Sequence, residues 1–227
     1  MCDISNIIFG AISLTAEDTE GQRVIEVGSY DENGSLRPLV EHFKPSEYIG
    51  TDLKGGPNVD LVCRGEDLLS VFAAEDFGVV ISTEVIEHVK DWRKFVSVLK
   101  HICKPEGIIL LTTRSFGYPY HAAPSDYWRF ELDDIANIFS DCHVLRLEPD
   151  SRSPGVFAKL KKPVDFVEKD LSDYELFSTI ACRRIRDIRE EDYRFFFFKK
   201  STRAFSTRIV FVVAKPFMTT LRFFVDI

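Results

Sequence analysis

Short β-branched runs alternate with longer mixed segments from Arg23 to about Lys162, and this alternation constrains the fold more than any other feature of the chain. Strands are predicted over residues 23–27, 48–52, 59–63, 78–82, 108–113, 143–147 and 156–160, with helices over 35–42, 66–74, 91–103 and 131–139. Strands that alternate with helices form βαβ units, and their strands pair in parallel. The predicted fold class is therefore α/β: a Rossmann-like, seven-stranded, mostly parallel sheet with helices on both faces, plus a C-terminal extension.

The helix that starts at Asp91 has the clearest signals. Asp is a preferred N-cap residue, and the apolar residues recur on one helical face: Trp92, Phe95, Val96, Leu99 and Ile102. Pro105 and Gly107 then end the helix and turn the chain into the next strand.

Composition narrows the class of protein. The chain has 227 residues, 45% of them hydrophobic, which is typical of a soluble globular protein of one domain plus an appendage. Its five cysteines form no CxxC pair, which argues against a zinc cage and against a secreted disulfide framework. Residues 1–16 carry no basic region of the kind that opens a signal peptide. We therefore expect a cytoplasmic protein.

The C-terminal part differs in composition from the rest. Residues 194–227 hold seven Lys and Arg against one acidic residue, which is a net charge of +6. Since the whole chain has a net charge of −7, residues 1–193 have a net charge of −13. We divide the chain into a domain at 1–162 and an extension at 163–227, with a helix predicted over 171–189. An acidic body is a poor general surface for nucleic acid, so no nucleic-acid partner is expected.

The extension has several interpretations. Nine of the twenty phenylalanines lie in residues 194–227, and Arg208, Lys215 and Arg222 are seven apart in an apolar stretch. On a helix these cations form one stripe, which is typical of interfacial membrane helices. The simpler interpretation is an element that packs on the domain. Peripheral membrane contact and a homodimer face at Phe195–Phe198 stay open as alternatives.

Two strand ends carry the signs of a nucleoside site. The first strand runs into a turn at Gly28, where a ligand can approach the backbone without meeting a Cβ. The second ends at Asp52, a position from which a carboxylate accepts both hydroxyls of a ribose. GxGxxG and Tyr-xxx-Lys are absent, which speaks against a nicotinamide-dependent oxidoreductase. The segment from Glu84 to His88 lacks the first histidine of an inverted zinc motif, so no metal site is expected.

Five blocks follow one another along the chain: VIEVGS at 24–29, YIGTD at 48–52, VCRGEDL at 62–68, VVISTEVIEHV at 79–89 and LKHICKPEG at 99–107. In order and spacing they resemble class I S-adenosylmethionine-dependent methyltransferases of the type 11 family, over about residues 20–162. The resemblance implies a seven-stranded sheet with its last strand antiparallel, and S-adenosyl-L-methionine as methyl donor.

The resemblance also assigns cofactor-binding positions. Glu26, Gly28 and Ser29 match the motif that wraps the methionine part, and Asp52 matches the ribose acid. Gly65 and Glu66 match the turn that borders the adenine. Thr83 and Glu84 match the segment that faces the sulfonium and the acceptor.

Two residues depart from the family pattern. Tyr30 stands where a second glycine is usual, and Arg64 stands where an aspartate often lies near the adenine. These departures keep an alternative open: a non-catalytic nucleoside-binding or scaffold protein with a methyltransferase-like fold.

The aromatic segment 114–130 joins the fifth predicted strand to the next helix. Irregular connections of this length are uncommon unless functional. Tyr118, Tyr120 and His121 are the proposed acceptor contacts. His121 and His88 are the candidate general bases, because a histidine titrates near neutrality and an acceptor hydroxyl or ammonium must lose a proton.

The predicted function is transfer of a methyl group from S-adenosylmethionine to an O or N atom. The acceptor is a small molecule, a glycan or a lipid-linked intermediate, the last of which would suit a protein peripherally attached to a membrane. Positioning does most of the work in such a displacement, and no metal is required for it.

Overall fold

The computed structural model describes residues 3–122 and 125–193. Seven strands form the main sheet: β1 (Arg23–Val27), β2 (Glu47–Asp52), β3 (Leu61–Val62), β4 (Phe77–Thr83), β5 (Cys103–Arg114), β7 (His143–Pro149) and β8 (Gly155–Lys161). They lie in the order β3-β2-β1-β4-β5-β8-β7, and β8 is antiparallel to both of its neighbours. The predicted fold class, including the antiparallel last strand, is confirmed.

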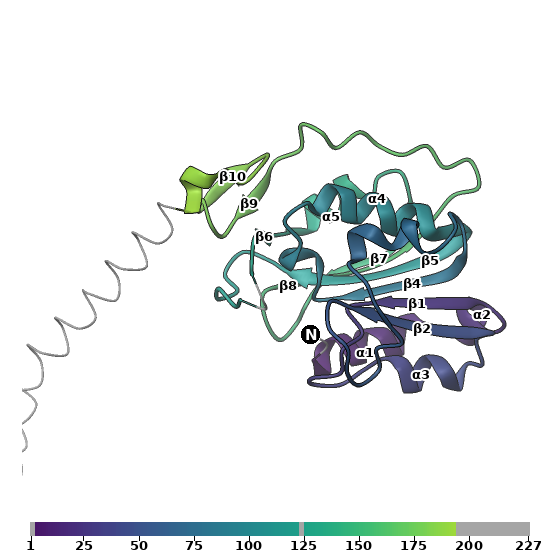
Figure 1. Cartoon of the computed structure of the whole chain (residues 1–227). Helices are drawn as coiled ribbons and strands as arrows, with labels where there is room; N and C mark the ends of the chain where they lie inside the picture. The colour runs from purple at the N-terminus through teal and green to yellow at the C-terminus, as the bar shows by residue number, and fades with distance from the viewer. Residues whose placement is uncertain (1–2, 123–124, 194–227) are drawn as a thin grey trace, which may run out of the picture.

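Helices cover both faces of this sheet (Figure 1). On one face lie α1 (Ile4–Ser13) and α3 (Arg37–His42), with the short α2 (Ala16–Thr19) between them in the chain. On the other lie α4 (Trp92–Ile102), α5 (Leu132–Ile138) and two 3₁₀ turns, η1 (Gly65–Ser70) and η2 (Ile86–His88). Each face has its own apolar cluster, one built around Phe9 and Val40 and the other around Phe95 and Leu99.

The helix expected after Asp91 is present, and Asp91 caps it by accepting a hydrogen bond from the Lys94 amide at 3.1 Å. The helix expected over 66–74 is shorter and tighter, since η1 ends at Ser70. The Ser70 hydroxyl donates to the Asp67 carbonyl at 2.7 Å. Side-chain bonds of this kind compete with the helical ladder.

Helix α1 was not among the predicted elements. Asp3 caps it, since its carboxylate accepts from the amides of Ser5 at 2.8 Å and Asn6 at 3.1 Å. The other Asp3 oxygen lies 3.0 Å from Arg114 at the end of β5, so the capping residue also joins the helix to the sheet.

The prediction of a helix over 171–189 is wrong. The chain there forms a hairpin of β9 (Leu176–Ser178) and β10 (Arg183–Ile185), and β9 pairs with β6 (Trp128–Arg129) in a second, three-stranded sheet. The Ser178 hydroxyl accepts from the amides of Ile180 and Ala181, which favours a turn over a helix.

Residues 162–175 connect β8 to this hairpin across the outer side of α4 and α5 (Figure 1). Arg93 on α4 donates to the carbonyls of Leu171 and Tyr174, which holds the connection in place. The predictions for residues 194–227, namely membrane contact and a homodimer face, lie outside the described residues. Among the helices that are described, none has the length and apolar character needed to cross a bilayer.

Candidate active site

A cavity of about 720 Å³ opens at the carboxyl ends of β1, β2 and β4. Most of its wall comes from five segments, represented by Val27 and Gly28, Thr51 and Asp52, the turn Cys63–Glu66, Glu84 with Val85 and His88, and Ala122, Ser125 and Tyr127; Phe95 on α4 completes it. Open α/β sheets bind ligands at this edge, and the volume is in the range of cofactor sites. This cavity therefore lies where the sheet topology predicts a ligand.

Gly28 presents bare backbone to the cavity. Its φ is +86°, a region that side-chain-bearing residues rarely adopt, and a Cβ built here would stand 2.2 Å from Val85 Cγ2. Its amide and that of Ser29 donate to the Thr51 carbonyl at 2.8 and 3.0 Å. These bonds join the turn after β1 to the end of β2.

Asp52 ends β2 and lies half-buried in the cavity wall. Its two carboxylate oxygens accept from the backbone amides of Tyr30 and Lys54, each at 3.3 Å. These long bonds orient the carboxylate, and each oxygen has a further lone pair that can accept from a bound hydroxyl.

Tyr30 and Arg64, the two departures from the family pattern, leave the cavity open. The Tyr30 ring packs against Gly56, where an added Cβ would stand 2.1 Å from the ring, and the Lys54 ammonium lies 4.0 Å from the ring centre. The Arg64 side chain is 63% exposed and pairs with Glu66 at 2.7 Å. Both side chains line the cavity without filling it.

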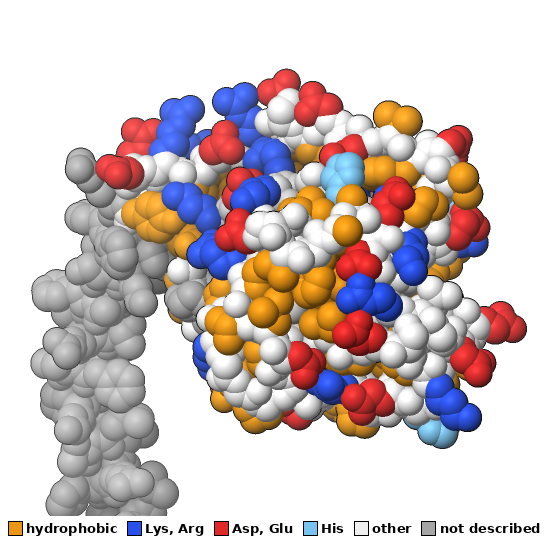
Figure 2. Space-filling model, turned by 45° about the vertical axis from the view of Figure 1, so that its right-hand side comes forward, with side chains coloured by type: hydrophobic (Ala, Val, Ile, Leu, Met, Phe, Trp, Pro, Cys, Tyr) orange, Lys and Arg blue, Asp and Glu red, His pale blue; other side chains and the backbone are white. Residues whose placement is uncertain are grey.

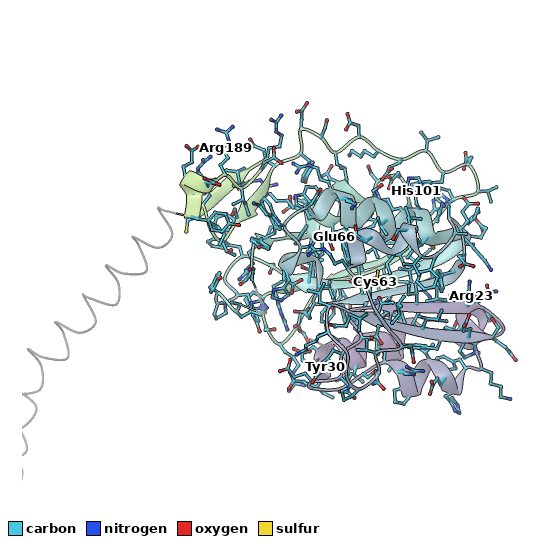
Figure 3. All side chains as sticks on the ribbon, in the orientation of Figure 1. Arg23, Tyr30, Cys63, Glu66, His101 and Arg189 are labelled. Carbon is cyan, nitrogen blue, oxygen red and sulfur yellow. The ribbon has the colours of Figure 1, made fainter. Side chains whose placement is uncertain are left out.

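The turn after β3 forms another part of the wall. Gly65 is buried, and a Cβ there would stand 2.3 Å from the Phe95 ring, so its backbone lies close to α4. Tyr30, Cys63 and Glu66 belong to the carboxyl-end side of the sheet, whereas Arg23 and His101 lie toward the opposite end (Figure 3).

Glu84 is a buried carboxylate in the wall. It directly follows β4, has φ +57°, and forms an ion pair with Arg114. Burial raises the pKa of Glu84 well above its ordinary value, the nearby Glu87 carboxylate raises it further, and Arg114 opposes both. Arg114 also pairs with Asp3 and Asp150, so this guanidinium is shared among three carboxylates.

His88 and His121 come together although 33 positions separate them in the sequence. Their ring centres are 4.7 Å apart. His88 lines the cavity, and its Nδ1 lies 2.5 Å from the Ser125 carbonyl oxygen. His121 places Nδ1 3.0 Å from Asp126, a fully buried carboxylate.

Burial alone would raise the pKa of Asp126, but hydrogen bonds from Arg129 and His121 outweigh it and hold that pKa at about 2. Because a carbonyl and a carboxylate both only accept, these contacts favour the imidazole tautomer that carries its proton on Nδ1 and leaves the lone pair on Nε2.

The structure places some of the predicted cofactor-binding residues in the cavity wall and others outside it. Gly28, Asp52, Gly65, Glu66, Glu84 and His88 line the cavity, whereas Glu26, Ser29 and Thr83 are buried and do not. Glu26 accepts a hydrogen bond from Tyr48, and burial raises its pKa to about 7. Tyr118 and Tyr120 are not part of the wall, although the Tyr118 ring centre lies 4.9 Å from that of His121.

Several residues in or beside the cavity wall were not among the predicted site residues. Lys54, Phe95, Val85 and Tyr127 line the cavity, and Arg114 organises the carboxylates beside it. Phe95 was assigned only to the helix core. Lys54, Val85 and Arg114 lie at or just after the ends of strands, and this position is the signal in the sequence that points to them.

The comparisons with known proteins agree with this geometry. The family described as methyltransferase domain matches residues 6–143. No curated protein matches the sequence.

Solved structures with the same fold share little sequence with the chain. The 1,6-didemethyltoxoflavin-N1-methyltransferase of Burkholderia thailandensis, solved with 1,6-didemethyltoxoflavin and S-adenosylhomocysteine, is 12% identical, with a TM-score of 0.58 over 71% of this chain and 79% of its own. An S-adenosylmethionine-dependent methyltransferase of Mesorhizobium loti is 13% identical, with a TM-score of 0.51 over 70% and 97%. The [4+2]-cyclase SpnF is 13% identical, with a TM-score of 0.53 over 70% and 81%.

The resemblance to class I S-adenosylmethionine-dependent methyltransferases is thus confirmed by the family match and by the shared fold. Since the matched segment covers more than half of its length, the chain belongs to the methyltransferase domain family.

Proposed function

We propose that the chain transfers a methyl group from S-adenosylmethionine to an O or N atom of a small-molecule, glycan or lipid-linked acceptor. One observation carries the proposal: the bare backbone of Gly28 and the carboxylate of Asp52 face the same cavity, at the sheet edge where nucleosides bind. The didemethyltoxoflavin enzyme with the same fold was solved with S-adenosylhomocysteine, which supports this choice of ligand.

The residues present fit this cofactor. Asp52 would hold the two ribose hydroxyls, and the Gly28 turn would lie along the methionine part. The Gly65–Glu66 turn, close to Phe95, would border the adenine. When bound, the cofactor would supply an electrophilic methyl group on a sulfonium, and S-adenosylhomocysteine, which keeps the electron pair of the broken C–S bond, would be the leaving group.

The chain itself then has to position the acceptor and receive its proton. His88, Ser125 and Tyr127 line the part of the wall contributed by η2 and the segment after β5, and we assign the acceptor to that part. In the tautomer with its proton on Nδ1, either His88 or His121 offers Nε2 to take the proton as the acceptor atom forms its new bond. Tyr118 and Tyr120 are assigned to the same side.

The alternative is a non-catalytic nucleoside-binding or scaffold protein. The fold alone does not decide between methyl transfer and this alternative, because SpnF, a [4+2]-cyclase, has the same fold. Acidic and basic side chains are intermixed on the face shown in Figure 2, which is poorly suited to a phosphate backbone and supports a small acceptor.

The test is transfer of labelled methyl groups to a panel of hydroxyl- and amine-bearing acceptors. We expect at least one labelled product with the natural sequence and a loss of about 100-fold or more with Asp52→Ala, because two hydrogen bonds to a charged carboxylate are together worth about 3 kcal/mol. Asp76→Ala is the matched control, since Asp76 pairs with Arg23 at the other end of the sheet. Tight binding of S-adenosylhomocysteine without transfer to any acceptor would favour the scaffold alternative.

A further inference from the structure

Three potential metal ligands converge beside the cavity. Glu87, His88 and His121 each offer one ligand atom, and these atoms all lie within 4.8 Å of one another. Glu87 and His88 come from η2, and His121 comes from the segment after β5. The inverted zinc motif lacks its first histidine in the sequence, but the fold supplies a second imidazole from elsewhere in the chain.

Glu87 is the most informative of the three. Its side chain is fully buried, and Oε2 accepts from the Thr113 hydroxyl at 3.0 Å. Oε1 is buried without a hydrogen bond from any described residue, and lies 4.0 Å from His88 Nε2. A buried carboxylate is costly unless a positive charge compensates it. Arg114, which directly follows Thr113 in β5, pairs with Glu84, Asp3 and Asp150 and not with Glu87.

A neighbouring polar group contacts the other polar atom of each ligand side chain and orients it, as is usual for metal ligands. The Ser125 carbonyl holds His88 Nδ1, and Asp126 lies 3.0 Å from His121 Nδ1. Both contacts leave Nε2 as the lone-pair atom. The Thr113 hydroxyl fixes the second oxygen of Glu87 in the same way.

We infer that Glu87, His88 and His121 form a binding site for a divalent transition metal, with zinc the best match. Two imidazoles and one carboxylate are a known zinc donor set, and the fourth position would face the cavity that His88 lines. Tetrahedral zinc with bonds of about 2.05 Å needs ligand atoms about 3.3 Å apart. Occupancy therefore requires the ligands to close by about 1 Å, through rotation of the two half-buried imidazoles.

A metal here would polarise an acceptor oxygen and make its proton easier to remove. The histidines would then act as ligands and not as bases. This role rests on the proposed function, whereas binding of the metal does not, so we test binding without cofactor or acceptor.

The experiment is calorimetric titration of the chelator-treated full-length protein with Zn²⁺, repeated with Co²⁺ by visible absorption. We expect one ion per chain and a tetrahedral Co²⁺ spectrum. His121→Gln and Glu87→Gln should each weaken Zn²⁺ binding more than 100-fold, beyond the 10–100-fold typical of losing a group behind a ligand.

Matched controls separate this site from surface binding. His101→Gln removes a half-exposed histidine that pairs with Glu168, and Cys63→Ser removes a thiol at the cavity wall; both should keep full affinity. The His121 side chain is 23% exposed, so His121→Gln should fold even if Glu87→Gln does not, and thermal melts check both. No one-to-one binding, or binding that His121→Gln leaves unchanged, would overturn the inference.

Discussion

At the scale of single residues, the cavity is shaped by backbone as much as by side chains. Gly28 and Gly65 shape the cavity because they have no side chain, and the sequence indicates both because glycine after a strand is a turn signal. Orientation was harder to predict. Successive strand residues face opposite sides of a sheet, so Val27 lines the cavity while Glu26 joins Tyr48 on the α1 and α3 face.

Gly28→Ala should destabilise the fold and prevent ligand binding. The new methyl group would meet Val85 at 2.2 Å on top of a strained φ, and we expect a loss of about 3 kcal/mol in the free energy of unfolding. Gly21→Ala is the control, because Gly21 has φ +67° but nothing within 4 Å of an added Cβ. It should cost only about 1–2 kcal/mol. Equal denaturation midpoints for the two variants would contradict the packing argument.

Glu26→Gln should change how stability depends on pH. Since burial raises the pKa of Glu26 from 4.5 to about 7, the folded chain keeps a proton that the unfolded chain releases. Stability contributed this way is lost as pH rises from 4.5 to 7, by about 3 kcal/mol. Glutamine has no such proton to lose. The free energy of unfolding of the variant, measured in urea, should therefore rise relative to that of the natural protein between pH 5 and pH 8. A constant difference across that range would show that Glu26 is ionised throughout.

At the scale of elements, helix α4 was predictable because cap, apolar face and terminator all occur within its own residues. The hairpin of β9 and β10 was not. Its partner strand β6 lies about 50 positions earlier, and a short apolar segment does not reveal a distant partner. The convergence of His88 with His121 escaped prediction for the same reason, although each was singled out alone.

Asp126 is fully buried in the segment between β5 and α5. Its carboxylate accepts from Arg129 at 2.5 and 2.8 Å, and Arg129 is itself buried. Asp126→Asn should cost about 2–3 kcal/mol at pH 7, because it leaves a buried guanidinium without its counter-charge. The contribution of Asp126 is complete above pH 3.8 and is lost as pH falls through about 2, so the difference should shrink in acid. The exposed Asp133→Asn should leave thermal melts unchanged.

At the scale of the whole molecule, the seven-stranded sheet with its antiparallel last strand and the ligand-binding edge were predicted from the sequence, because five blocks in fixed order resemble one family. The division at residue 162 was drawn from the change in the sequence pattern after Pro163. Residues 163–193 in fact pack against α4 and α5 and pair with β6, which ties the described part of the extension to the methyltransferase domain.

Arg208, Lys215 and Arg222 would form one cationic stripe on a helix, and membrane attachment through that stripe is the alternative to packing on the domain; it would suit a lipid-linked acceptor. We expect the full chain to co-sediment with vesicles that contain anionic lipid, and a version ending at Tyr193 to stay in the supernatant, since the shortened protein loses a net charge of +6. Vesicles of zwitterionic lipid are the control. Equal behaviour of the two proteins with anionic vesicles would remove the idea.

The most direct test of the cofactor site is a crystal structure grown with S-adenosylhomocysteine. We expect its ribose hydroxyls within hydrogen-bond distance of the Asp52 carboxylate, with its amino-acid part along the Gly28 turn. A ligand bound elsewhere, or a cavity closed by the Tyr30 ring or by Arg64, would contradict the account.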